Sequence, residues 1–208
     1  MLRHLILPLF ILLGMALCLP ACKSSQKTSQ SQETPTKKGR ADDKDKTASS
    51  VEPFDGTIKW ITIQEAAKLS EKKPRKIIMD VYTDWCGWCK KMDASTFQHP
   101  AVAKYISENF YAVKLNGESK DVINFKGKDY KFVQSGMRGY NELAAFFLNG
   151  QLGYPSIVFL DEKLDLIQTL PGYKDAKTFD LIAHFFGQNE HKKGTFDQFA
   201  AQYKSIIE

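Results

Sequence analysis

The residues whose types and spacing could do chemistry are two cysteines in the run Trp85-Cys86-Gly87-Trp88-Cys89-Lys90. Two cysteines separated by two residues can close a small ring, so the pair can alternate between a dithiol and a disulfide. The pair follows an apolar stretch and opens a helical pattern, where unpaired backbone N–H groups and the helix dipole favour a thiolate. Such a position lowers the pKa of a thiol from ~8.5 to about 7 or below. We expect Cys86 to attack a disulfide and Cys89, one turn further on, to resolve the mixed disulfide.

The same spacing is also half of a zinc site, which is the alternative reading of the pair. Completing four ligands would require His99, His184 or His191, and these stand at no recognisable spacing from one another. We therefore expect no metal here and no organic cofactor, because thiol exchange needs neither.

Residues 1–22 have the pattern of a secretory signal, with a positive start and an almost wholly apolar stretch at 5–19. The stretch is short for a spanning helix, which needs about 20 apolar residues. It ends in Leu19-Pro20-Ala21-Cys22, which resembles the lipobox of bacterial lipoproteins, whose cysteine is lipidated after cleavage. The alternative is ordinary cleavage that leaves a soluble protein. We expect Cys22 to carry a lipid anchor in the bacterial cell envelope, with the protein facing the periplasm or the exterior.

The N-terminal pattern also bears on the other cysteines. Cys18 would be discarded with the signal and Cys22 consumed by lipid, which leaves one close pair in place of a structural disulfide framework. Residues 23–53 contain hardly an apolar side chain and predict a flexible polar tether. Residues 54–208 then form one folded domain. The net charge of +5 is spread without a basic run interleaved with aromatics, so nucleic acid is not an expected partner.

The domain reads as a β-α-β unit followed by a hairpin and helices, which defines an α/β class with a mixed sheet. Its first half predicts a helix opened by a capping box at Thr62 and ending near Lys72, a buried strand at 76–82, helices at 89–96 and 100–109, and a strand at 110–115. Its second half predicts strands at 156–160 and 164–170 joined by a hairpin turn, a helix at 175–186 and a last helix from Thr195.

Two further features stand outside this core pattern. The polar segment 117–140 predicts a small exposed hairpin in which 123–125 and 130–132 flank the turn 126–129. The last helix, with Gln198 as the capping partner of Thr195, is expected to place four apolar residues on one side: Phe196, Phe199, Tyr203 and Ile206.

The stretch from Ile78 to Lys90 resembles the active-site strand and helix of thioredoxin, and the resemblance extends over roughly 76–186. It implies a thioredoxin-like fold, a mixed central sheet flanked by helices, with an inserted hairpin and an extra C-terminal helix. The Gly-Trp dipeptide between the cysteines and the long interval before Pro155 differ from thioredoxin. Together with Asp84-Trp85 they are closer to the branch that includes the periplasmic C-terminal domain of the DsbD electron-transfer protein.

The resemblance implies roles for residues around the pair. Asp80, six residues before Cys86, would be the buried carboxylate that assists proton transfer at the resolving thiol, with a pKa raised by desolvation. The alternative is an aspartate on a solvated strand face. Lys114 matches a lysine that neighbours this carboxylate, with a plain strand-edge lysine as the alternative. Trp85, Gly87 and Trp88 would shape the immediate setting of the sulfurs.

The run Gly153-Tyr154-Pro155-Ser156 resembles the cis-proline loop that faces the cysteines in this fold. A cis bond at Pro155 would present the backbone of Tyr154 to an extended substrate, whereas an ordinary trans turn is the alternative. Gly172 matches the glycine that lets substrate approach near the end of the last strand.

These features predict an enzyme, an envelope thiol-disulfide oxidoreductase that reduces client disulfides through a mixed disulfide on Cys86. Oxidase or isomerase activity would use the same residues and differ in reduction potential. The expected partners are disulfide-bonded client proteins and an upstream thiol donor, with the chain itself a monomer. The alternative from another class is a membrane-tethered binding module whose partner interaction does not need the thiols.

Overall fold

The computed structural model of the protein describes residues 54–207. The predicted signal, the lipidation site Cys22 and the polar tether lie outside the described residues. Within 54–207, no helix combines the length and the apolar character needed to cross a membrane.

A five-stranded sheet forms the centre of the described region, in the order β1-β3-β2-β8-β9. Strand β2 lies in the middle, parallel to β3 and antiparallel to β8, so the predicted mixed sheet is confirmed. All but the last residue of β2 is buried, as its continuous apolar run predicts for a strand covered on both faces. The strands are β1 (Trp60–Ile61), β2 (Lys76–Tyr82), β3 (Phe110–Asn116), β8 (Ser156–Leu160) and β9 (Leu166–Pro171).

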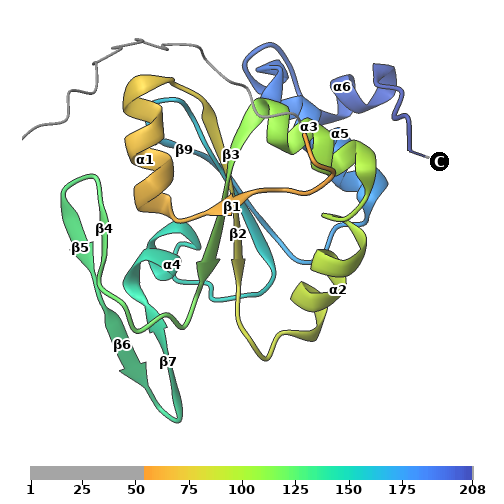
Figure 1. The fold of residues 1–208 in the computed structure, drawn as a ribbon. Coiled ribbons are helices and arrows are strands. Elements are labelled where there is room, and N and C mark those ends of the chain that lie inside the picture. The colour runs from red at the N-terminus through yellow and green to blue at the C-terminus, as the bar shows by residue number, and fades with distance from the viewer. Residues whose placement is uncertain (1–53, 208) are drawn as a thin grey trace, which may run out of the picture. The chain divides into compact units, whose positions relative to one another are not determined.

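Helices cover both faces of this sheet (Figure 1). Helices α1 (Ile63–Lys72) and α4 (Glu142–Phe147) bury side chains in the core on one face, together with the odd-numbered positions Ile77, Met79 and Val81 of β2. Helices α2 (Gly87–Ser95), α3 (Pro100–Asn109) and α5 (Ala176–Gly187) bury theirs in the core on the other face. Alternate residues of β2 thus anchor opposite layers, which fixes the direction in which Asp80 points.

Helix ends follow the predicted capping signals. The Thr62 hydroxyl accepts a hydrogen bond from the Glu65 N–H at 3.2 Å, and the Glu65 carboxylate accepts one from the Thr62 N–H at 2.8 Å. Thr195 and Gln198 cap α6 (Phe196–Gln202) in the same way, after a short 3-10 helix at Glu190–Lys192. The expectation that Ile206 shares the apolar side of this helix is wrong, because α6 ends at Gln202 and Ile206 is 81% exposed.

The insertion departs most from the prediction of one small exposed hairpin. It holds two hairpins, β4 (Ile123–Phe125) with β5 (Lys128–Tyr130), and β6 (Phe132–Ser135) with β7 (Arg138–Asn141). The first is not simply exposed, because alternate side chains on one of its faces are buried in the core beside α4: Ile123, Phe125 and Tyr130. The polar residues on the opposite face of this hairpin are the reason that the sequence predicts an exposed segment.

Two boundaries shift for local reasons. Helix α2 begins at Gly87, two residues before the predicted Cys89, because Cys86 itself caps the helix with its sulfur. Strand β9 begins at Leu166 and not at Leu164, since Leu164 adopts a φ of 65° in the turn that follows β8.

Candidate active site

The two cysteines are joined as a disulfide at the N-terminus of α2. Cys86 is the N-cap residue, and its Sγ accepts a hydrogen bond from the backbone N–H of Cys89 at 3.0 Å. An N–H that points at a sulfur stabilises a thiolate there once the disulfide opens. Cys86 is buried in this oxidised form. It is only 5% exposed, because its sulfur faces the helix end and is bonded to that of Cys89.

Asp80 is buried, as the resemblance implied, with 1% of the residue exposed. It lies on β2 and pairs in register with Lys114 on β3 and with Ile157 on β8. Its Oδ2 accepts a hydrogen bond from Lys114 Nζ at 2.7 Å, whereas Oδ1 has no partner among the described residues. Burial raises the pKa of Asp80 to about 6, although Lys114 works in the opposite direction.

Lys114 neighbours the buried Asp80 across the β2–β3 register, as the resemblance implied. It lies one residue beyond the positions of β3 that pair with β1, and its side chain is 21% exposed. Its ammonium contacts a second carboxylate, that of Asp93 on α2, which is 43% exposed. Burial disfavours the charged ammonium, but the two carboxylates outweigh it and raise the pKa of Lys114. Asp93 was not among the predicted site residues. Its place four residues after Cys89 on a helix was the signal that could have found it.

Three aromatic rings surround the same ammonium. Lys114 Nζ lies 4.9 Å from the ring centroid of Trp60, 5.0 Å from that of Tyr82 and 5.5 Å from that of Phe97. Cation–π attraction and the two carboxylates together hold this lysine charged in a largely dry setting. Lys114 therefore connects the buried Asp80 to the solvent-facing Asp93 through one fixed cation.

The bond between Tyr154 and Pro155 is cis, which confirms that prediction. The Pro155 carbonyl accepts a hydrogen bond from the N–H of Gly172 at 2.7 Å, and Gly172 has the positive φ of 84° that favours glycine. The ring of Tyr154 meets that of Trp85 edge-on, with centroids 6.1 Å apart. Because Trp85 directly precedes Cys86, the cis-proline loop lies beside the disulfide.

Two indoles flank the cysteines on the surface, with Trp85 52% and Trp88 57% exposed. Trp88 packs against Tyr173, with centroids 5.3 Å apart, and the ammonium of Lys91 lies over both rings. Tyr173 was not predicted as a site residue, although it follows the predicted Gly172. Predicted residues from α2, the cis-proline loop and the end of β9 thus meet around one disulfide. Gly87, at the first position of α2, leaves open space where a side chain would stand.

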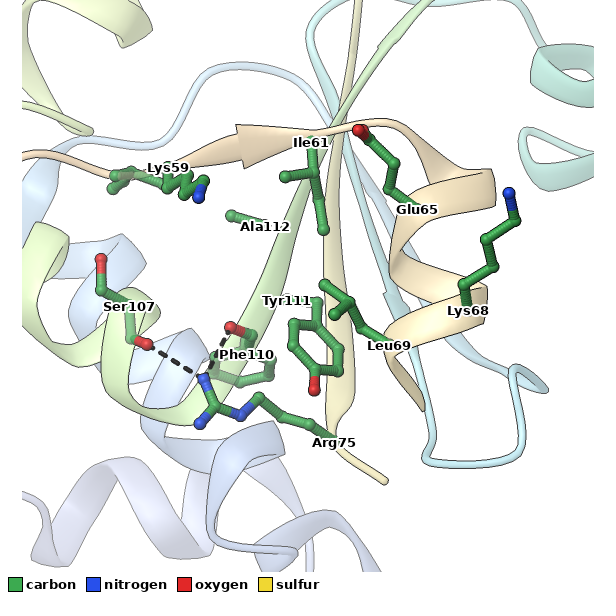
Figure 2. Close-up of a pocket in the computed structure, with 11 residues that line it drawn as sticks. Lys59, Ile61, Glu65, Lys68, Leu69, Arg75, Ser107, Phe110, Tyr111 and Ala112 are labelled. Carbon is green, nitrogen blue, oxygen red and sulfur yellow. Dashed lines mark hydrogen bonds between the residues drawn. The ribbon is translucent and has the colours of Figure 1, made fainter. Parts of the chain in front are cut away.

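A separate pocket of about 470 Å³ lies at the β1 edge of the sheet, between α1 and α3 (Figure 2). Arg75 closes one end of it by donating hydrogen bonds to the carbonyls of Ser107 at 3.1 Å and Phe110 at 3.4 Å. None of the predicted site residues lines this pocket. The predicted site at the disulfide is therefore separate from this pocket.

The fold and the site define a class: a mixed sheet with a cysteine pair capping the helix after its central strand, next to a cis-proline loop. The model of a family described as "Thioredoxin-like domain" matches residues 63–187, which is more than half of the chain. The chain belongs to this thioredoxin-like family. The family and the disulfide-bonded cysteine pair together support a thiol-disulfide oxidoreductase in the general sense.

Solved structures and curated proteins are similar to parts of the chain. A thioredoxin-fold protein from Helicobacter pylori is 19% identical with a TM-score of 0.48, covering 62% of this chain and 79% of that one. A putative disulphide-isomerase from Bacteroides thetaiotaomicron is 21% identical with a TM-score of 0.45, covering 62% of this chain and 93% of that one.

Human spermatogenesis-associated protein 20 is 30% identical over 61 residues, 29% of this chain. The uncharacterized Caenorhabditis elegans protein B0495.5 is 27% identical over 77 residues, 37% of this chain. These matches span only 8% and 11% of the two curated proteins.

Proposed function

We propose that this protein is an envelope thiol-disulfide oxidoreductase that reduces disulfides in client proteins. The observation that carries the proposal is the sulfur of Cys86, which caps α2 and accepts the Cys89 N–H at 3.0 Å. That arrangement favours Cys86 as a thiolate, the form that attacks a disulfide. In this proposal, the disulfide between Cys86 and Cys89 is the oxidised form that the protein reaches when it has reduced a client.

The reaction proceeds in two exchanges. The Cys86 thiolate attacks one sulfur of the client disulfide, so a Cys86–client bond forms and the other client sulfur leaves as a thiolate. Cys89, deprotonated, then attacks Cys86 Sγ, which forms the protein disulfide and releases the second client thiolate. Two electrons pass from the protein to the client. An upstream thiol donor returns the protein to its dithiol form by the same exchange in reverse.

Asp80 is the proposed proton acceptor for Cys89 in the second step. It lies on the strand that leads into α2, and burial raises its pKa to about 6, nearer to that of a thiol than an ordinary carboxyl would be. Its Oδ1 is buried and has no partner among residues 54–207, so one oxygen remains available while Oδ2 holds Lys114. Lys114 positions the carboxylate and partly neutralises its charge.

The proposed location rests on the N-terminal sequence. A lipid on Cys22 and a polar tether of about 30 residues would let the domain stand roughly 30 Å from a membrane. A Cys22→Ala variant should leave the membrane fraction and lose the acyl mass on its N-terminal peptide. If the variant stays membrane-bound and the mass of its N-terminal peptide still includes the acyl group, the proposal that Cys22 carries a lipid anchor is wrong.

Insulin reduction with dithiothreitol as donor tests the activity. The wild-type domain should accelerate precipitation of the insulin B chain, and Cys86→Ser should abolish the acceleration. The reduction potential of the pair then tests the direction of electron transfer, because reductants of this kind have potentials of about −270 mV and strong oxidants of about −120 mV. A potential near the oxidant value would overturn the reductase direction. A client interaction that survives loss of both cysteines would instead support a binding module.

A further inference from the structure

The second inserted hairpin, β6–β7, reaches the disulfide surface. In Figure 1 it lies at the same end of the sheet as the loop from β2 into α2, which carries the cysteines. The contact is made by Arg138, whose guanidinium carbon lies 4.2 Å from the centroid of the Trp85 ring. Since Trp85 directly precedes Cys86, the hairpin places a cation over the residue next to the attacking cysteine.

The hairpin is built as a firm arm. Its strands pair over four positions, and the Gln134 side-chain amide donates to the carbonyls of Gly136 at 2.8 Å and Arg138 at 2.7 Å across the turn. At Gly139 a Cβ would overlap the Phe132 ring and the Val133 carbonyl, so the close cross-strand packing requires glycine.

The base of the arm is fixed to the domain through Asn141. This residue is fully buried and its N–H donates to the Gly117 carbonyl at 2.8 Å. Its side-chain amide donates to the carbonyls of Ser119 at 3.1 Å and Asp121 at 3.0 Å. Gly117 in turn contacts the ring of Tyr154 in the cis-proline loop, so the arm and the substrate-binding loop share one anchor.

The arm and the surface beneath it expose large side chains to solvent. Met137 at its tip is 101% exposed, and Trp85 beneath Arg138 is 52% exposed. The Arg138 side chain is itself 57% exposed and lies 3.8 Å from Glu118, which leaves much of its donor edge facing water. A flexible thioether and a planar cation on an indole suit contact with a partner more than they suit stability.

Positive charge also borders the other side of the disulfide. Lys90 and Lys91 lie on α2, and Lys174 follows the glycine turn after β9. Among residues 54–207, no carboxylate lies within 4.0 Å of these three ammonium groups, although Lys174 donates to the carbonyls of Pro171 and Gly172. This side of the disulfide therefore combines aromatic rings with three ammonium groups that pair with no carboxylate of the described region, whereas Arg138 on the other side lies beside Glu118.

We propose that β6–β7 is a recognition arm that selects client segments with an acidic residue next to an apolar residue beside the target cysteine. The guanidinium of Arg138, held over the Trp85 ring, receives the client carboxylate through paired N–H donors in place of its 3.8 Å contact with Glu118, and Met137 covers the apolar side chain. This inference rests on the proposed function, because it names the class of segment that the same disulfide surface accepts.

The test uses the reduced domain and two synthetic peptide disulfides that share one apolar residue but carry glutamate or lysine beside the cysteine. A neutral small disulfide, hydroxyethyl disulfide, is the third substrate. The wild type should reduce the glutamate peptide about tenfold faster than the lysine peptide in kcat/KM. In Arg138→Ala this ratio should fall to about 1, and Arg138→Lys should retain part of it, because the charge stays and the planar fork is lost.

The matched control is Lys128→Ala in the other hairpin, where an ammonium also lies over a ring, 4.7 Å from the centroid of Tyr130. This control should keep the wild-type ratio. If Arg138→Ala lowers both peptide rates equally, or if the wild type shows no preference while it still reduces hydroxyethyl disulfide, the recognition arm is wrong. If the wild type exchanges with none of the three disulfides, the proposed function itself fails.

Discussion

Replacing Asp80 with asparagine should stabilise the oxidised protein at neutral pH. The carboxyl is 1% exposed, and its burial raises the pKa from the ordinary 3.8 to about 6. A group whose pKa is raised on folding binds its proton more tightly in the folded state. The stability that the folded protein gains from this tighter proton binding at Asp80 is therefore fully present below pH 3.8 and is lost as the pH rises through about 6. Ionised Asp80 then costs about 3 kcal/mol at neutral pH, the free-energy equivalent of this change in pKa.

An asparagine keeps the shape and removes the charge that must be buried. From the two pKa values, the stability gain of Asp80→Asn should be about 1 kcal/mol near pH ~4.5 and about 3 kcal/mol near pH ~7.5. Urea unfolding of the oxidised domain at both pH values measures it. The control is Asp93→Asn, which removes the other carboxylate at Lys114 but from a position that is 43% exposed. That variant should show no comparable gain.

A pH-independent difference between wild type and Asp80→Asn would refute the reasoning, as would a variant that is less stable at neutral pH. The first result would mean that the ion pair with Lys114 at 2.7 Å balances the cost of burial, and the second that it outweighs this cost. The same variant should also slow the resolving step at neutral pH, because its amide cannot accept the Cys89 proton.

Three further changes have defined outcomes. Gly172→Ala should cost about 1 kcal/mol in urea unfolding, since its φ of 84° strains any side chain although nothing but Lys174 lies within 4 Å of a Cβ. Gly117→Ala should push Tyr154 out of place, because a Cβ there overlaps its ring, and should lower the rate of insulin reduction severalfold while reduction of hydroxyethyl disulfide falls less. Thr62→Ala should cost about 1 kcal/mol by removing the α1 capping box, and a midpoint equal to wild type would contradict that.

Much of the sheet and its helices could be predicted from local pattern. The apolar run of β2, the proline at the start of α3 and the two capping boxes each act within a few residues, so their signals are visible in sequence. The resemblance to thioredoxin predicts the site residues Asp80, Lys114 and Pro155. The register of β2 and β3 places Asp80 opposite Lys114 and so accounts for the ion pair between these two residues.

The missed features depend on contacts between distant segments. Helix α4 has only six residues, too few for a clear periodic pattern, although Asn141 caps it with its side chain. The stacking of Arg138 on Trp85 joins residues far apart in the chain, and no spacing rule connects a hairpin tip to a helix N-terminus. Burial of Cys86 likewise depends on how the disulfide lies against the end of α2. The spacing of the two cysteines predicts that the disulfide can form, but it does not predict this orientation.

The most direct test of the central claim is the intact mass of Cys89→Ser after reaction with a disulfide-bonded substrate. This variant keeps the proposed attacking sulfur of Cys86 and lacks the resolving one, so it should accumulate a mixed disulfide that dithiothreitol releases. Cys86→Ser, treated in the same way, should form little or none. Equal adducts on both variants, or a predominant adduct on Cys89, would contradict the assignment of Cys86 as the nucleophile.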